Sequence, residues 1–157
     1  SMTRVAIRPV RRNGQGLSRI VTSPLKRAFE TAEIVNRILG LSVSRHAGLI
    51  ERAFGPHEGR QWFSGFVDAD LEGMESVSDF TTRIINALDE VLTRYPAPVL
   101  IVCHGGVYRA FAQVLCALPD ARAANCVPFR FDPPGEHSSH WRITPVDPVR
   151  TEENTAP

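Results

Sequence analysis

Apolar residues recur along the chain in two patterns. Short runs that alternate or are unbroken are typical of strands, and longer stretches with a three- and four-residue step are typical of helices with one buried face. The short runs predict strands at 3–7, 17–22 and 99–103. The longer stretches predict helices at 24–39, 78–95 and 107–118. The run at 99–103 (VLIVC) has no polar position and indicates a strand covered on both faces, as in parallel sheets.

The ends of these elements carry their own signals. Ser23 is predicted as the N-cap of the first helix, Pro24 as its first residue, and Gly40 as its end. Residues 41–74 mix glycine, proline, aromatic and charged residues without sustained periodicity, so we expect a loop with short helical pieces. Residues 125–143 predict two late strands around a Pro-Pro-Gly turn.

This order of elements predicts the fold class. Strands that alternate with helices favour an α/β three-layer sandwich, a mainly parallel sheet flanked by helices. At 157 residues the chain fits one domain, which we place at 2–145. The polar, proline-containing residues 146–157 are predicted to be a disordered tail.

Composition narrows the classes of function. A net charge of +1 argues against a broad basic surface for nucleic acid or an anionic membrane, so any anion site should be local. The three cysteines form no C-x-x-C pair, so neither a disulfide framework nor a zinc site is expected, and no metal or cofactor is called for. No apolar stretch reaches membrane-spanning length and no signal peptide is visible. We therefore expect a cytoplasmic protein.

Two places in the chain share one arrangement, in which a strand ends, a few polar residues follow and a helix begins. They are Thr22 to Ala28 and Cys103 to Gly106. In open α/β sheets ligands bind beyond the carboxyl ends of strands, where helix N-termini favour anions. Arg27 falls in a first helical turn, where a cation opposes the helix dipole, and a bound anion would explain its placement. Arg27 and His104 are therefore candidates for one pocket.

Four strings in the chain resemble segments of the histidine phosphatase superfamily, the phosphoglycerate-mutase-like enzymes. Residues 23–32 (SPLKRAFETA) resemble its S-P-L-x-R-A-x-x-T-A segment, and 49–59 (LIERAFGPHEG) its L-x-E-x-x-F-G-x-x-E-G segment. Residues 102–106 resemble its V-x-H-G-G segment, and 75–83 its helix-opening E-S-x-x-D/E-F-x-x-R segment. Four patterns in the right order are more specific than one.

The resemblance implies phosphoryl transfer through a phosphohistidine. A histidine in an R-H-G motif attacks phosphorus, and two arginines with a second histidine surround the transferring group. On this sequence Arg27 corresponds to the second arginine, His104 to the second histidine, and Glu51 to the acid that protonates the leaving oxygen. The backbone N–H groups of Gly105 and Gly106 are expected to add donors to phosphate, and no metal is implied because arginines supply the charge.

The nucleophile of that mechanism is missing, because no R-H-G occurs in the chain. The nearest counterpart is Ile7-Arg8-Pro9, where proline stands for the histidine and Arg8 takes the first arginine position. The first βα unit also looks shortened, since about nine residues separate the first two predicted strands and a parallel crossover needs a dozen or more. A natural deletion, a truncation and an omitted stretch remain open, as do a rearranged sheet and a strand borrowed in a homodimer.

Two functions follow from these observations. The first is a phosphomonoester hydrolase or mutase-like fold that binds a small phosphorylated substrate or phosphate, with catalysis impaired by the missing nucleophile. The alternative is a non-catalytic module that binds a phospholigand or another protein through the same residues.

Overall fold

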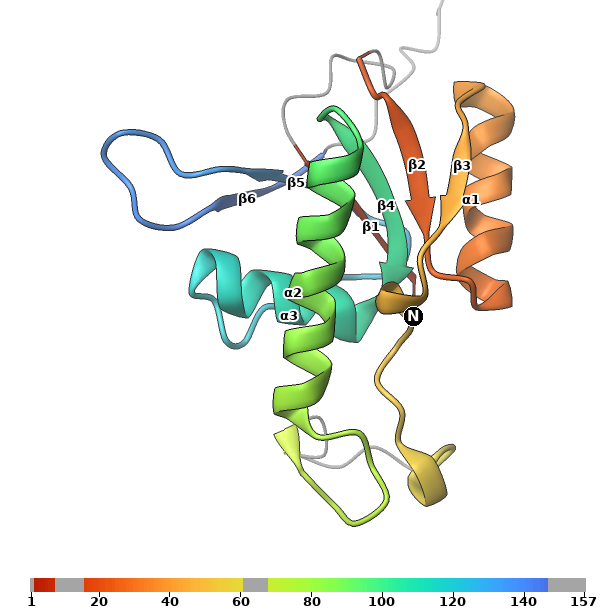
Figure 1. Cartoon of the computed structure of the whole chain (residues 1–157), viewed down its shortest axis with the longest axis vertical. Helices are drawn as coiled ribbons and strands as arrows, with labels where there is room; N and C mark the ends of the chain where they lie inside the picture. The colour runs from red at the N-terminus through yellow and green to blue at the C-terminus, as the bar shows by residue number, and fades with distance from the viewer. Residues whose placement is uncertain (1, 8–15, 61–67, 147–157) are drawn as a thin grey trace, which may run out of the picture.

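The computed structural model describes residues 2–7, 16–60 and 68–146, and its strands form one sheet (Figure 1). The strands are β1 (Met2–Ile7), β2 (Arg19–Thr22), β3 (Val43–Arg45), β4 (Val99–His104), β5 (Pro128–Asp132) and β6 (Arg142–Pro145). Their order across the sheet is β3-β2-β4-β1-β5-β6. The pairs β2–β3, β2–β4 and β1–β5 are parallel, and β1–β4 and β5–β6 are antiparallel. The sheet is thus mainly parallel, as predicted.

Helices cover both faces of this sheet. They are α1 (Lys26–Leu39), α2 (Val77–Arg94) and α3 (Gly105–Cys116). The all-buried strand β4 separates two clusters of core side chains. Val99, Ile101 and Cys103 belong to the cluster that contains the inner faces of α2 and α3, whereas Leu100 and Val102 belong to the cluster that contains Ala32 of α1. In Figure 1 α1 accordingly lies on one side of the sheet and α2 with α3 on the other. The three-layer prediction is confirmed.

Two helix starts differ from their predicted positions. α1 begins at Lys26 with Leu25 as its N-cap, so the prediction of Ser23 as N-cap was wrong. The Ser23 hydroxyl lies against His104 instead and accepts a hydrogen bond from the N–H of Leu25 at 3.3 Å, which makes Ser23 a turn residue two positions before the N-cap. α3 begins at Gly105, directly after β4 and two residues before the predicted start at Val107.

Residues 41–74 hold more regular structure than their sequence pattern predicts. Two short 3₁₀ helices are present as expected, η2 (Ala47–Leu49) and η3 (Gly55–His57). The strand β3 was missed, because three residues are too few to set up an alternation of apolar and polar positions. β3 forms by pairing with β2 at the sheet edge, an interaction that a local pattern cannot report.

Strand β1 lies at the centre of the sheet, but it runs antiparallel to β4. Its last residue Ile7 pairs with Val99, and Arg19, the first residue of β2, pairs with Val99 from the other side. Ile7 and Arg19 therefore lie on either side of a single strand at one end of the sheet, about 10 Å apart, which is within reach of a short link. A parallel β1 would need a full crossover, for which this link is too short.

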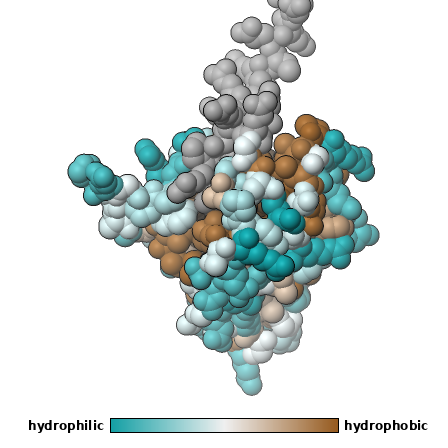
Figure 2. All heavy atoms as spheres, turned by 45° about the horizontal axis from the view of Figure 1, so that its top comes forward, coloured by the Kyte–Doolittle hydropathy of each residue, from teal (hydrophilic) through white to brown (hydrophobic). Residues whose placement is uncertain are grey.

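The exposed surface contains few large apolar side chains. Figure 2 shows one face, which is mostly hydrophilic with hydrophobic residues in separate patches. Among the described residues the exposed large apolar side chains are Ile34, Ile38, Leu71, Val114, Leu118 and Val146. Dispersed residues of this kind are ordinary on a protein surface.

Candidate active site

The predicted site residues of the first and third motifs meet where β2 and β4 end. The two strands are parallel neighbours, so Ser23 and His104 leave the sheet at the same edge. The Nε2 atom of His104 lies 2.8 Å from the Ser23 hydroxyl oxygen. The backbone N–H of Ser23 donates to the carbonyl of Val102 at 3.0 Å, which extends the β2–β4 pairing up to the site.

His104 is fully buried at this edge. Burial, and next the positive charge of Arg27, lower the pKa of His104 from 6.5 to about 4. The imidazole is therefore neutral at neutral pH. Its second nitrogen, Nδ1, is also buried and has no hydrogen-bond partner among the described residues. Through Nδ1 this neutral ring can therefore donate or accept one more hydrogen bond.

Arg27 is exposed in the first turn of α1. No hydrogen bond or ion pair joins its guanidinium to another residue of 2–7, 16–60 and 68–146, while its charge reaches the His104 ring. The neighbouring Lys26, in contrast, has an i,i+4 partner in Glu30 at 3.7 Å. Arg27 thus keeps its donors available beside a buried histidine, the condition that forked binding of an anion requires.

Glu51 lies at the start of α3. One carboxylate oxygen, Oε2, accepts a hydrogen bond from the N–H of Gly106 at 3.1 Å, and the other, Oε1, accepts one from the N–H of Arg52 at 3.1 Å. The approach is so close that a Cβ on Gly106 would stand 2.2 Å from Oε1, so glycine is required for this arrangement. Glu51 therefore touches the helix terminus that begins one residue after His104.

The structure thus brings Arg27, Glu51, His104 and Gly105 to one edge of the sheet, with Gly105 as the first residue of α3. Arg8 lies outside the described residues, as do the aromatic residues of 61–67. His57 has its Nε2 atom 3.2 Å from the Glu72 carbonyl, and His46 has Nε2 2.9 Å from Glu90 Oε2. Among the described residues, these contacts tie both histidines to other parts of the chain and not to His104, Arg27 or Glu51.

The cysteine next to His104 belongs to the core. Cys103 is fully buried in the core, as predicted for a small apolar residue, and burial raises the pKa of its thiol. Across the described ranges no group of three or more histidine, cysteine or acidic residues could hold a metal ion.

Two features were missed from the sequence. The first is Ser23 as the partner of His104, because a serine before proline reads as a helix cap. The second is a set of ion pairs behind Glu51, in which Arg83 binds Glu75 and the buried Arg52 binds Asp70. The fourth motif contains Glu75 and Arg83 at the start of α2, so their identity was visible while their contact with the Glu51 loop was not.

An α/β sheet whose strand ends gather a histidine, an arginine and a helix N-terminus defines a class of anion-binding sites. The chain belongs to the histidine phosphatase superfamily (branch 1), whose family model matches residues 8–128. The match leaves Met2–Ile7, the strand β1, outside.

Several known proteins are similar to this chain. A 95-residue stretch is 39% identical to the uncharacterized phosphatase PhoE of Bacillus subtilis and covers 58% of this chain and 49% of that one. A 113-residue stretch is 29% identical to the putative phosphoserine phosphatase 2 of Hydrogenobacter thermophilus and covers 63% and 56%. The chain thus spans about half the length of these curated relatives.

Solved structures share the fold. The complex of a mycobacterial glucosyl-3-phosphoglycerate phosphatase with inorganic phosphate matches with a TM-score of 0.62 and 19% identity over 91% of this chain and 95% of that one. YhfR of Bacillus stearothermophilus matches with a TM-score of 0.62 and 22% identity over 74% and 81%. Within the described residues no helix combines the length and apolar character needed to cross a membrane.

Proposed function

We propose that this chain binds phosphate or a small phosphomonoester at the edge where β2 and β4 end, and that turnover is impaired. One observation carries the proposal, the meeting of the exposed Arg27, the buried neutral His104 and the first turn of α3. A tetrahedral anion there takes forked hydrogen bonds from Arg27 and backbone donors from Gly105. The similarity to a phosphatase solved with inorganic phosphate supports the same ligand class.

Each side chain has a distinct role in this proposal. Arg27 supplies the positive charge that the phosphoryl oxygens need. His104 turns its imidazole toward the ligand while Ser23 fixes the ring. As the resemblance implies, Glu51 is the acid that would give a proton to the leaving oxygen when a nucleophile attacks the phosphorus of a bound ester. No metal or cofactor enters the scheme.

Impaired turnover follows from the missing nucleophile. In the family resemblance the attacking histidine follows the first strand, and here Arg8-Pro9 follows Ile7. The antiparallel direction of β1 supports the proposal, because Ile7 pairs with Val99 and Met2 pairs with His104. Ile7, the carboxyl end of β1, thus lies at the end of β4 opposite His104.

A specific observation favours the alternative, a binding module without catalysis. Both oxygens of Glu51 accept hydrogen bonds from backbone N–H groups, and one of these is Gly106 of α3. This carboxylate competes with an incoming anion for the helix N-terminus. A site of this kind can retain a ligand without processing it, so both proposals share the ligand and differ in turnover.

Two further proposals concern setting and assembly. We place the protein in a reducing, cytoplasmic compartment, where its three free thiols are stable. We also propose that the chain forms a homodimer, which sedimentation of the full chain would test.

A paired experiment separates the readings. Inorganic phosphate at roughly ten times its Kd should add about 1.4 kcal/mol of stability, a rise in Tm of about 3 to 6 °C. Arg27→Gln should abolish the rise, whereas Arg37→Gln, a matched change of an exposed arginine in the last turn of the same helix, should keep it. The same preparations are given p-nitrophenyl phosphate. Absent turnover with a phosphate shift supports the proposal, Arg27-dependent turnover replaces it with an active enzyme, and no shift refutes the site.

A further inference from the structure

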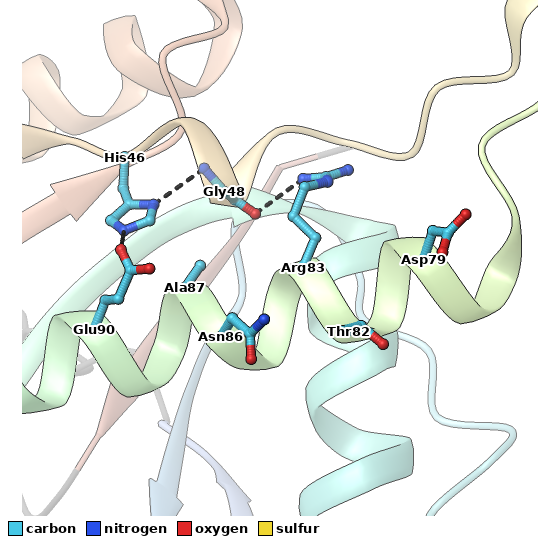
Figure 3. Close-up of a pocket in the computed structure, with 8 residues that line it drawn as sticks. All are labelled: His46, Gly48, Asp79, Thr82, Arg83, Asn86, Ala87 and Glu90. Carbon is cyan, nitrogen blue, oxygen red and sulfur yellow. Dashed lines mark hydrogen bonds and ion pairs between the residues drawn. The ribbon is translucent and has the colours of Figure 1, made fainter.

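The loop that carries Glu51 is held from both sides by one pair of residues. On its N-terminal side, Nη1 of Arg83 donates to the carbonyls of Gly48 and Ile50, at 2.9 and 3.0 Å. On its C-terminal side, Oε2 of Glu75 accepts a hydrogen bond from the N–H of Ala53 at 3.1 Å. Figure 3 shows Arg83 extending from α2 toward the Gly48 carbonyl. The backbone is therefore fixed immediately before and shortly after Glu51.

Arg83 and Glu75 also fix each other. Nε of Arg83 donates to Oε1 of Glu75, and Nη2 donates to Oε2, both at 2.8 Å. This forked pair is half-buried, with 29% of the Arg83 side chain and 18% of the Glu75 side chain exposed. Burial raises the pKa of Glu75, but the hydrogen bonds from Arg83 and Ala53 outweigh it and leave that pKa below its usual value. A forked, partly desolvated ion pair of this kind has one defined geometry.

Arg52 extends the same arrangement to the residue next to Glu51. The buried Arg52 donates from Nε to the backbone carbonyl of Glu75 at 2.8 Å, while its own N–H binds Oε1 of Glu51. The backbone on both sides of Glu51 is therefore hydrogen-bonded to residues at the start of α2, either directly or through Arg52. The carboxylate of Glu51 lies at the far end of this chain of contacts, 3.1 Å from the Gly106 nitrogen.

We propose that Arg83 and Glu75 are positioning residues whose forked pair holds Glu51 against the first turn of α3. The proposal rests on the proposed function, since Glu51 matters there as the group beside the ligand. Neither residue touches the ligand. They act by fixing the loop that carries Glu51. Free movement of this loop would separate the Glu51 carboxylate from the first turn of α3 and from the ligand. The fourth sequence motif thereby gains a role that its position alone does not suggest.

The amide signal of Gly106 in ¹⁵N–¹H NMR spectra reports the Glu51 contact directly. Glu51→Ala gives the reference displacement of this signal when the contact is lost. Arg83→Gln should move the signal in the same direction by at least half of that displacement, and Glu75→Gln, which removes the charge but keeps an acceptor for Ala53, should do likewise. Arg130→Gln is the matched control, because it removes a similar part-buried ion pair, with Asp132 on β5, away from the site.

The outcomes decide the proposal whether or not phosphate binds. If the Gly106 signal of Arg83→Gln and Glu75→Gln stays where Arg130→Gln leaves it, the pair is structural only and the proposal is overturned. If phosphate binds, Arg83→Gln should change the Kd for phosphate at least twofold, in the same direction as Glu51→Ala changes it. When both substitutions are combined, the Kd should equal that of Glu51→Ala alone. If phosphate does not bind, the proposed function fails, and the Gly106 signal alone still decides the positioning.

Discussion

The acid sensitivity of the fold should come in large part from His104. Its pKa of about 4 in the folded chain lies below the ordinary value of 6.5 that it regains on unfolding. As pH falls below 6.5 the unfolded state takes up the proton first, so stability is complete above that pH and is lost progressively toward pH 4. Each pH unit in this window costs about 1.4 kcal/mol, and the whole window about 3 kcal/mol.

Urea denaturation of the native chain and of His104→Gln, from about pH 7 down to pH 4.5, measures this effect. Glutamine keeps a polar group that can hydrogen-bond to the Ser23 hydroxyl but does not titrate. The contributions of the carboxylates common to both chains cancel in the difference. The advantage of the native chain should shrink by about 2 to 3 kcal/mol across the range. His137→Gln, at an exposed position, should follow the native chain throughout. Parallel curves for the native chain and His104→Gln would refute the assignment of a buried neutral imidazole.

Three substitutions test other parts of the structure. Gly106→Ala should push the Glu51 carboxylate away from α3. The free energy of unfolding should change by no more than about 1 kcal/mol, because the higher helix propensity of alanine offsets the lost hydrogen bond. Thermal melting followed by circular dichroism measures this change. Glu51→Gln should lower the Kd for phosphate, measured by calorimetry, at least about fivefold, since a negative charge about 4 Å from the anion costs about 1 kcal/mol even in water. Weaker binding would contradict the competition between the Glu51 carboxylate and phosphate for the N-terminus of α3. Phe131→Ala should cost about 3 to 5 kcal/mol in urea unfolding, whereas Ile38→Ala, at an 88% exposed position, should stay within about 0.5 kcal/mol; equal losses would refute the core.

The central part of the fold could be predicted from local patterns. The unbroken run at 99–103 gave β4, and periodic apolar positions gave all three helices because each packs one face against the sheet. Pairing between distant residues could not be predicted. β3 exists by its contact with β2, and the direction of β1 is set by the short link to β2 together with its register against Val99.

The candidate site divides in a similar way. Arg27 and His104 could be placed together because parallel neighbouring strands end at one edge of a sheet. Glu51 came from the family resemblance, and its bond to Gly106 depends on a loop that no periodic pattern describes. Ser23 was misjudged because its position before proline resembles a helix cap, whereas a hydrogen bond to the residue 81 positions later orients its hydroxyl.

The most direct test of the account is a titration of the ¹⁵N-labelled chain with inorganic phosphate, followed through the ring nitrogens of His104 and the amides of Gly105 and Gly106. The account predicts saturable shifts at all three residues with one common Kd, and their loss in Arg27→Gln. Shifts that are absent, or that are unchanged in Arg27→Gln, would contradict a phosphate site at this edge of the sheet.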